Sequence, residues 1–162
     1  MADALEPKQL TTYFALMEAV SLLQHAVTQQ LQAEGGLSYV QFELLARLAD
    51  SGAPLTMTEL ADGVVYSRSG LTHQAGLLEK AGLVVRAPSA EDQRATVVSI
   101  TEAGRELVAK VLPGHVEVVR RLLVAPLSTE DLDALGGIMA RVRDHMRAEP
   151  PRSAATRRGR VL

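Results

Sequence analysis

The chain has 162 residues, of which 47% are hydrophobic and 22% are charged, and this composition excludes a fibrous or largely disordered protein. It contains no cysteine, which excludes disulfides, thiolate metal sites and cysteine-based redox sensing. The net charge of −2 by itself argues against a nucleic-acid partner, but the distribution of the charges along the chain is more informative than their sum. Residues 1–64 hold eight acidic and two basic side chains, whereas the segment from residue 150 onward holds four arginines and no acid.

The N-terminus, MADALEPKQL, lacks the basic region and apolar run of a signal peptide. No apolar stretch in the sequence reaches the ~18 residues that a membrane-spanning helix needs. Because the chain also lacks cysteine, we expect a cytoplasmic protein with no membrane partner.

A long first helix is predicted between Pro7, which suits a first helical position, and Gly35-Gly36, which ends it. Its apolar residues recur at helical spacing in two neighbouring rows. One row is Leu16, Val20, Leu23, Val27 and Leu31, and the other is Leu10, Phe14 and Met17. A helix with this much apolar surface is expected to be buried on more than one side.

Three shorter helices follow, and each has its own start signal. Ser38-x-x-Gln41 and Thr56-x-x-Glu59 are capping boxes for the first two, and Ser67 is the expected N-cap of the third. In this third helix the residues expected to face inward are Leu71, Ala75 and Leu78. Gly82 is expected to end it.

The residue pattern then changes to that of strands. Residues 83–86 and 96–100 are β-branched runs on either side of the polar stretch 88–94, which predicts a hairpin with a long loop. Thr101 caps a fifth helix, and Ser128 opens a sixth. In the sixth helix the residues expected to point inward are Leu132, Leu135, Met139, Val142 and Met146.

The predicted fold class is mainly α with a small β-hairpin wing, because a short helix, a turn and a capped helix before a hairpin are typical of a winged helix-turn-helix. We assign residues 37–104 to this DNA-binding domain, residues 5–35 and 105–148 to a helical dimerisation region, and residues 149–162 to a basic, disordered tail. The terminal helices carry more apolar surface than one winged-helix core can cover. This excess favours a homodimer over a monomer whose outer helices pack only on each other.

The helix after Ser67 is the candidate recognition helix. With Leu71 and Ala75 facing inward, the residues that project outward near its start are Ser67, Arg68, Ser69, Thr72, His73 and Gln74. Arginine can bridge guanine and glutamine can bridge adenine in the major groove, while hydroxyls can bind phosphates. The alternative is an ordinary solvated helix face.

The hairpin supplies a second set of candidate DNA contacts, namely Arg86, Asp92 and Arg94. An arginine at the tip of a hairpin can enter a narrow minor groove, and a nearby aspartate can orient it. The alternative for Asp92 and Arg94 is a solvated surface ion pair.

The sequence resembles the MarR (multiple antibiotic resistance regulator) family in three stretches. These are Leu60-Ala61 with Ser67 and Leu71-Thr72, then Leu78-Glu79-Lys80-Ala81-Gly82-Leu83-Val84-Val85-Arg86, and then residues 92–104, which are similar to the wing pattern D-x-R-x-x-x-V-x-L-T-x-x-G with Ile100 in place of leucine. The resemblance implies a dimer on a pseudo-palindromic operator, with contacts from the recognition helix and from Arg94. The sequence departs from the family at one position, because His73 stands where many relatives carry arginine or another base-contacting residue, and histidine is mostly uncharged at neutral pH.

The resemblance also implies a small aromatic or phenolic effector. The candidate lining residues are Tyr13, His25, Tyr39 and Tyr66, and the alternative is that they are ordinary, partly buried side chains. No histidine is spaced for a metal site, and no nucleophile elbow or phosphate loop occurs, so we expect no metal, no cofactor and no enzyme.

The sequence therefore predicts a sequence-specific DNA-binding transcriptional regulator, expected to be a repressor, that acts as a homodimer on double-stranded DNA. The alternative is a winged-helix protein-interaction module that does not bind DNA. It draws support from the acidic body of the chain.

Overall fold

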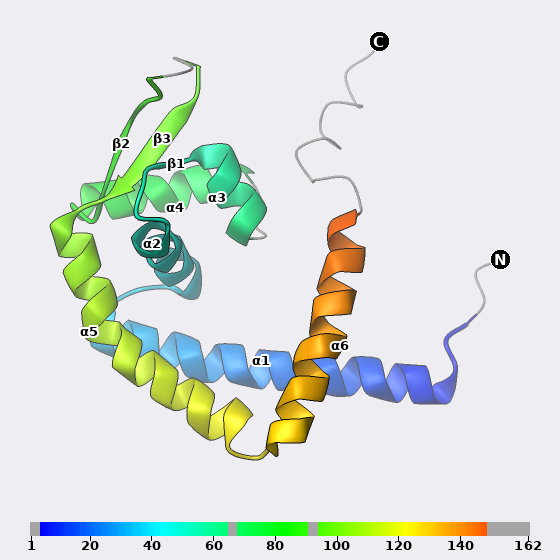
Figure 1. Ribbon diagram of the computed structural model, residues 1–162. Coiled ribbons are helices and arrows are strands. Elements are labelled where there is room, and N and C mark those ends of the chain that lie inside the picture. The colour runs from blue at the N-terminus through cyan, green and yellow to red at the C-terminus, as the bar shows by residue number, and fades with distance from the viewer. Residues whose placement is uncertain (1–3, 65–67, 91–93, 149–162) are drawn as a thin grey trace, which may run out of the picture.

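The computed structural model describes residues 4–64, 68–90 and 94–148, and the predicted basic tail lies outside them. The fold is the expected one, mainly helical with a small antiparallel sheet (Figure 1). The elements are α1 (Pro7–Gly35), α2 (Tyr39–Ser51), β1 (Leu55–Thr56), α3 (Met57–Val64), α4 (Arg68–Lys80), β2 (Val84–Pro88), β3 (Thr96–Ile100), α5 (Glu102–Val119), the π-helical turn η1 (Arg120–Val124) and α6 (Thr129–Ala148).

The predicted capping boxes form. The Ser38 hydroxyl accepts a hydrogen bond from the Gln41 amide at 3.2 Å, and the Ser38 amide donates to the Gln41 side chain at 3.0 Å. Thr56 and Glu59 make the same reciprocal pair at the start of α3. These local contacts satisfy backbone donors that a helix leaves unpaired, which is why both helices begin where the sequence predicts.

The core of the subunit lies where α2, α3 and α4 pack against the sheet. Its fully buried side chains include Leu44, Leu45, Leu48, Leu60, Leu71, Leu78, Val84 and Val98. They extend to α1 and α5 through Leu31 and Val111. The segment from α2 to β3 therefore contributes most of the core, which α1 and α5 complete.

The sheet has one strand more than predicted. Its order is β1-β3-β2 and all pairs are antiparallel, with Leu55 opposite Val98 in the short strand that the sequence analysis missed. The prediction that the wing loop begins at residue 88 is also wrong, because Pro88 pairs with Thr96 at the end of β2. Strand β2 lies at the edge of the sheet, where a proline without an N–H group is tolerated.

The start of α5 is locked to the turn that leads out of α4. The Thr101 hydroxyl accepts from the Gly104 amide at 3.1 Å, which confirms Thr101 as the cap. The same hydroxyl donates to the Gly82 carbonyl oxygen at 2.8 Å. A side chain at position 104 would collide with the Leu83 carbonyl oxygen, which explains why glycine occupies it.

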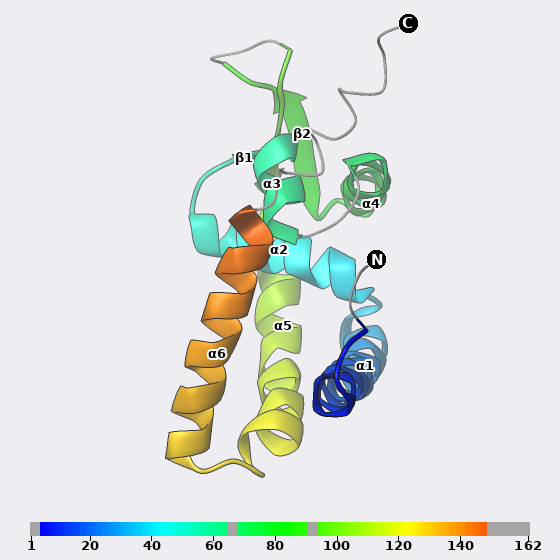
Figure 2. The same cartoon turned by 90° about the vertical axis from the view of Figure 1, so that its right-hand side faces the viewer.

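The prediction for α6 is wrong in one respect. Within the described part of the subunit none of its residues is buried, and Met146 is 66% exposed. Figures 1 and 2 together show that α6 stands away from the helical body, separated from α5 in one view and from α1 in the other. The helical spacing correctly marked an apolar face, but in the single subunit this face is incompletely covered, with Leu132, Leu135 and Met139 half-buried and Val142 and Met146 exposed.

The first half of α1 is similarly uncovered. Of the eight apolar residues in its two predicted rows, only Val27 and Leu31 are buried, and both lie in its second half beside α5. Phe14 is 63% exposed. In the part of the chain that the structure describes, no helix is long and apolar enough to cross a bilayer.

Candidate nucleic-acid interface

The two faces of α4 are divided as the sequence predicts. Leu71, Ala75 and Leu78 are buried, which seats the helix against α2 and α3. The opposite face exposes Ser69, Thr72 and His73, with Gln74 half-buried. The side chains of Ser67 and Arg68 lie outside the described residues, although the backbone of Arg68 begins the helix.

The wing projects beyond the helical body on the side of α3 and α4 (Figure 2). Strands β2 and β3 pair from Val84–Ile100 to Pro88–Thr96, and the Ser89 amide donates to the Ala95 carbonyl oxygen at 2.8 Å to extend the ladder. Arg94 is exposed near the end of this hairpin, and Asp92 lies outside the described residues.

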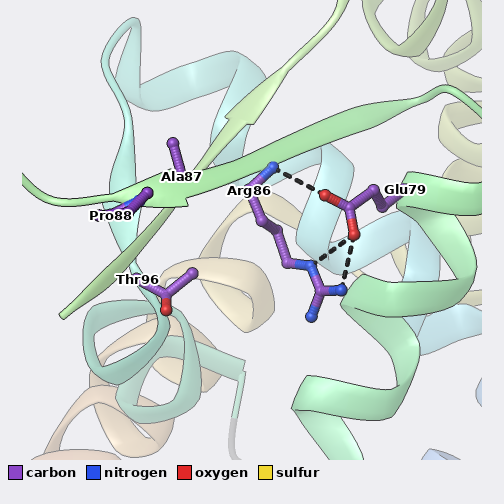
Figure 3. Close-up of a pocket in the computed structure, with 5 residues that line it drawn as sticks. All are labelled: Glu79, Arg86, Ala87, Pro88 and Thr96. Atoms are coloured by element: carbon purple, nitrogen blue, oxygen red, sulfur yellow. Dashed lines mark hydrogen bonds and ion pairs between the residues drawn. The ribbon is translucent and has the colours of Figure 1, made fainter. Parts of the chain in front are cut away.

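Arg86 is placed differently from Arg94. It lies within β2, and its guanidinium turns toward α4, where Nε and Nη2 donate to Oε2 of Glu79 at 2.8 and 2.6 Å (Figure 3). Hydrogen bonds from Arg86 lower the pKa of the Glu79 carboxyl below its usual value. The bonds from the Arg86 side chain have the larger effect, and the bond from its backbone amide has the smaller one. Sequence reasoning quoted Glu79 as part of a motif but missed it as a functional candidate. Its opposite charge seven residues before Arg86 was the available signal.

A cleft of about 250 Å³ brings together residues from several elements beside the wing. It is lined by Thr72 of α4, Arg86 of β2, Arg94 and Ala95, Thr96 of β3, and Thr56, Met57 and Thr58 at the start of α3. Three predicted DNA contacts, Thr72, Arg86 and Arg94, therefore share one surface. The sequence analysis did not anticipate the threonine hydroxyls beside them.

The proposed effector residues are not gathered in the same way. Tyr13 packs edge-to-face on Phe14 with ring centroids 5.3 Å apart, and His25 is exposed twelve residues further along α1, about 18 Å away at 1.5 Å per residue. Tyr39 is half-buried on α2 and hydrogen-bonds Glu43, and burial raises the pKa of both groups. Tyr66 lies outside the described residues.

The histidines show no metal-binding arrangement. Among the described residues, no three histidine or carboxylate side chains cluster closely enough to hold an ion. The ring of His115 packs on Phe42 at 4.7 Å, and burial lowers the pKa of this imidazole below 6.5.

Comparison with known proteins decides the family. The model of the MarR family matches residues 35–95. The HTH-type transcriptional regulator PecS of Dickeya dadantii is 30% identical over 132 residues, which cover 80% of this chain and 79% of PecS. The chain belongs to the MarR family.

Solved MarR-family structures share the whole architecture. Sco3205 of Streptomyces coelicolor, a MarR family transcriptional regulator solved in complex with DNA, is 32% identical, with a TM-score of 0.85 over 94% of both chains. AbsC, from the same organism, is also 32% identical, with a TM-score of 0.84 over 91% of this chain and all of AbsC. This chain is therefore a MarR-family transcriptional regulator of the winged-helix class, as its sequence predicts.

Proposed function

We propose that this MarR-family regulator binds operator DNA with α4 in the major groove and the β2–β3 wing beside it. The observation that carries the proposal is the shared surface on which Thr72, Arg86 and Arg94 meet, next to the exposed face of α4. A helix and a hairpin placed in this way can contact neighbouring grooves of one duplex. The 32% identity to a relative solved with DNA supports the same partner here.

The residues of α4 and the wing have separate roles in this proposal. Arg68 and Gln74 read base edges, and Ser67, Ser69, Thr72 and His73 contact bases or phosphates near the helix start. Arg94 enters the minor groove with Asp92 beside it.

A homodimer completes the proposed binding unit. Residues 5–35 and 105–148 form the dimerisation region in this proposal, and its support is the uncovered apolar surface of α1 and α6. Exposed apolar surface of this extent marks an association site in a soluble protein. A two-fold dimer would set two copies of α4 about 34–36 Å apart, which matches one turn of B-form DNA.

The proposal also includes a small aromatic effector. Its support is the aromatic pair Tyr13–Phe14, which lies within the uncovered surface of α1. Salicylate serves as a phenolic probe: we expect it to weaken DNA binding by the wild type, and to do so less for Tyr13→Leu. Equal salicylate responses of the two proteins would exclude Tyr13 from the effector site.

Selection of bound duplexes from random DNA tests the main proposal. We expect enrichment of a palindrome with half-sites one helical turn apart, and steep loss of affinity as salt rises, because several phosphates are contacted. Absence of any enriched sequence would reject operator binding and favour the protein-interaction alternative. A promoter carrying the selected site, fused to a reporter, then tells repression from activation.

A further inference from the structure

The contact between Glu79 and Arg86 ties the recognition helix to the wing. Besides the two guanidinium bonds to Oε2, the backbone amide of Arg86 donates to Oε1 of Glu79 at 3.1 Å (Figure 3). One carboxylate thus holds the backbone and the side chain of the same strand residue. Both side chains are only about one-third exposed, at 36% for Glu79 and 30% for Arg86.

The backbone bond matters because β2 is an edge strand. Strand β2 pairs with β3 along one of its sides. The Arg86 amide lies on the other side of β2 and donates to Glu79. Glu79 therefore takes the place of a neighbouring strand at this point of the edge. The guanidinium also passes over Gly76, where an added Cβ would stand 3.8 Å from Nη2.

The turn between α4 and β2 is fixed at its base as well. Gly82 has a left-handed backbone with a φ of 74°, and the Thr101 amide donates to the Leu83 carbonyl oxygen at 3.0 Å. Thr101 and Gly104 thus anchor the turn to α5. Strand β1 holds the hairpin through β3, and the Glu79–Arg86 contact adds a direct tie between β2 and α4.

We propose that Glu79 and Arg86 are positioning residues, a clasp that fixes the wing against α4 so that Arg94 and the recognition face meet DNA in one geometry. The inference rests on the proposed function and deepens it. It assigns Arg86 to the clasp and not to a phosphate, in contrast to the sequence-based expectation of a direct contact.

The direction in which one substitution changes the DNA affinity separates the two roles. Glu79→Gln makes the protein more positive and releases Arg86. If Arg86 were a phosphate ligand restrained by Glu79, this variant would bind DNA as well as or better than the wild type. If the clasp positions the wing, it binds about tenfold more weakly despite the added charge.

The measurement is the affinity of the full-length protein, at fixed salt, for a labelled duplex that the wild type enriched from random DNA. Asp50→Asn is the control for charge, because Asp50 is exposed at the end of α2, outside the recognition helix, the wing and the helices proposed for dimerisation, and undergoes the same charge change. We expect this control to bind within about twofold of the wild type. Thermal unfolding of both variants checks that each is folded.

A double-mutant cycle tests whether Arg86 acts through Glu79. Arg86→Gln alone should weaken binding about as much as Glu79→Gln, and the double variant should be no weaker than the worse single variant. In an Arg94→Ala background, Glu79→Gln should have little further effect, because the wing no longer delivers its arginine. Additive losses, or wild-type affinity in Glu79→Gln, would overturn the positioning role.

Amide hydrogen exchange examines the clasp without DNA. We expect the Arg86 amide to exchange faster in Glu79→Ala than in the wild type, since its acceptor is removed. Equal exchange would overturn the clasp while leaving the proposed function intact. A wild-type protein that enriches no duplex would instead reject the proposed function, and with it the role of the clasp in DNA binding.

Discussion

The segment from α2 to β3 and the pair of helices α1 and α6 solve the problem of apolar surface in different ways. The first buries a cluster of leucines and valines around Leu45 and Leu71, in a core that residues of α1 and α5 complete. The second leaves Phe14 and Met146 exposed in the single subunit. A segment whose apolar side chains are buried can present polar residues to a ligand, whereas an uncovered apolar face requires another surface. The two regions should therefore respond differently to substitution.

The largest difference is expected for the core of the winged segment. Leu45→Ala removes a fully buried side chain of α2 and should lower the free energy of unfolding by about 2–5 kcal/mol. The matched control is Leu22→Ala, which changes an exposed side chain of α1. The stability of both variants is measured by urea denaturation in dilute protein. A loss of stability in Leu22→Ala equal to that in Leu45→Ala would contradict the contrast between the regions.

A pair of glycines sharpens the same comparison. Gly104→Ala forces a methyl group against the Leu83 carbonyl oxygen and should cost about 1–3 kcal/mol. Gly137 on α6 has open space around it, so Gly137→Ala should stabilise the protein by up to about 1 kcal/mol through helix propensity. Thermal unfolding measures both. Destabilisation by Gly137→Ala in a protein shown to be dimeric would place Gly137 inside the subunit contact.

The uncovered face is tested directly by Ile138→Asp on α6, where the side chain is exposed in the subunit. A charge at an apolar interface is poorly solvated, so we expect the dissociation constant of the proposed dimer to rise about tenfold or more. Sedimentation velocity over a concentration series measures this constant. The circular dichroism spectrum should be unchanged, and an unaffected dimer would show that this face of α6 is not the interface.

The smallest expected effect is a pH dependence from His115, which joins α5 to Phe42 of α2. Burial lowers the pKa of this imidazole, so between pH 6.5 and the lower folded pKa the unfolded chain binds more protons than the folded one. Stability should be complete above pH 6.5 and should fall as the pH drops through this window. His115→Phe keeps an aromatic ring on Phe42 and should flatten the profile. An unchanged pH profile of unfolding in His115→Phe would contradict this account.

Local signals predicted most element boundaries correctly. Ser38, Thr56 and Thr101 each cap a helix by contacts within three residues, and Gly36, Gly52 and Gly82 adopt the left-handed backbone that ends one. The outward face of α4 followed from the burial of Leu71 and Ala75. Such features depend on residues close in sequence, so periodicity and capping rules were sufficient.

Features that depend on distant residues were missed or misjudged. The strand Leu55–Thr56 is too short to give a pattern of its own and exists because β3 lies beside it. The inward direction assigned to α6 was wrong because helical spacing identifies an apolar face but not the molecule that covers it. The role of Glu79 depends on the turn that brings α4 back to β2.

By itself the sequence determined the order of the elements, the caps that start and end them, the polar face of α4 and the family to which the chain belongs. Tertiary structure alone decided that Arg86 points to Glu79 and that Thr72 shares a cleft with Arg86 and Arg94. The physical reason is the distance along the chain over which each effect acts. Capping and periodicity act over one or two turns of helix, whereas the pairing of charges depends on how separate elements pack.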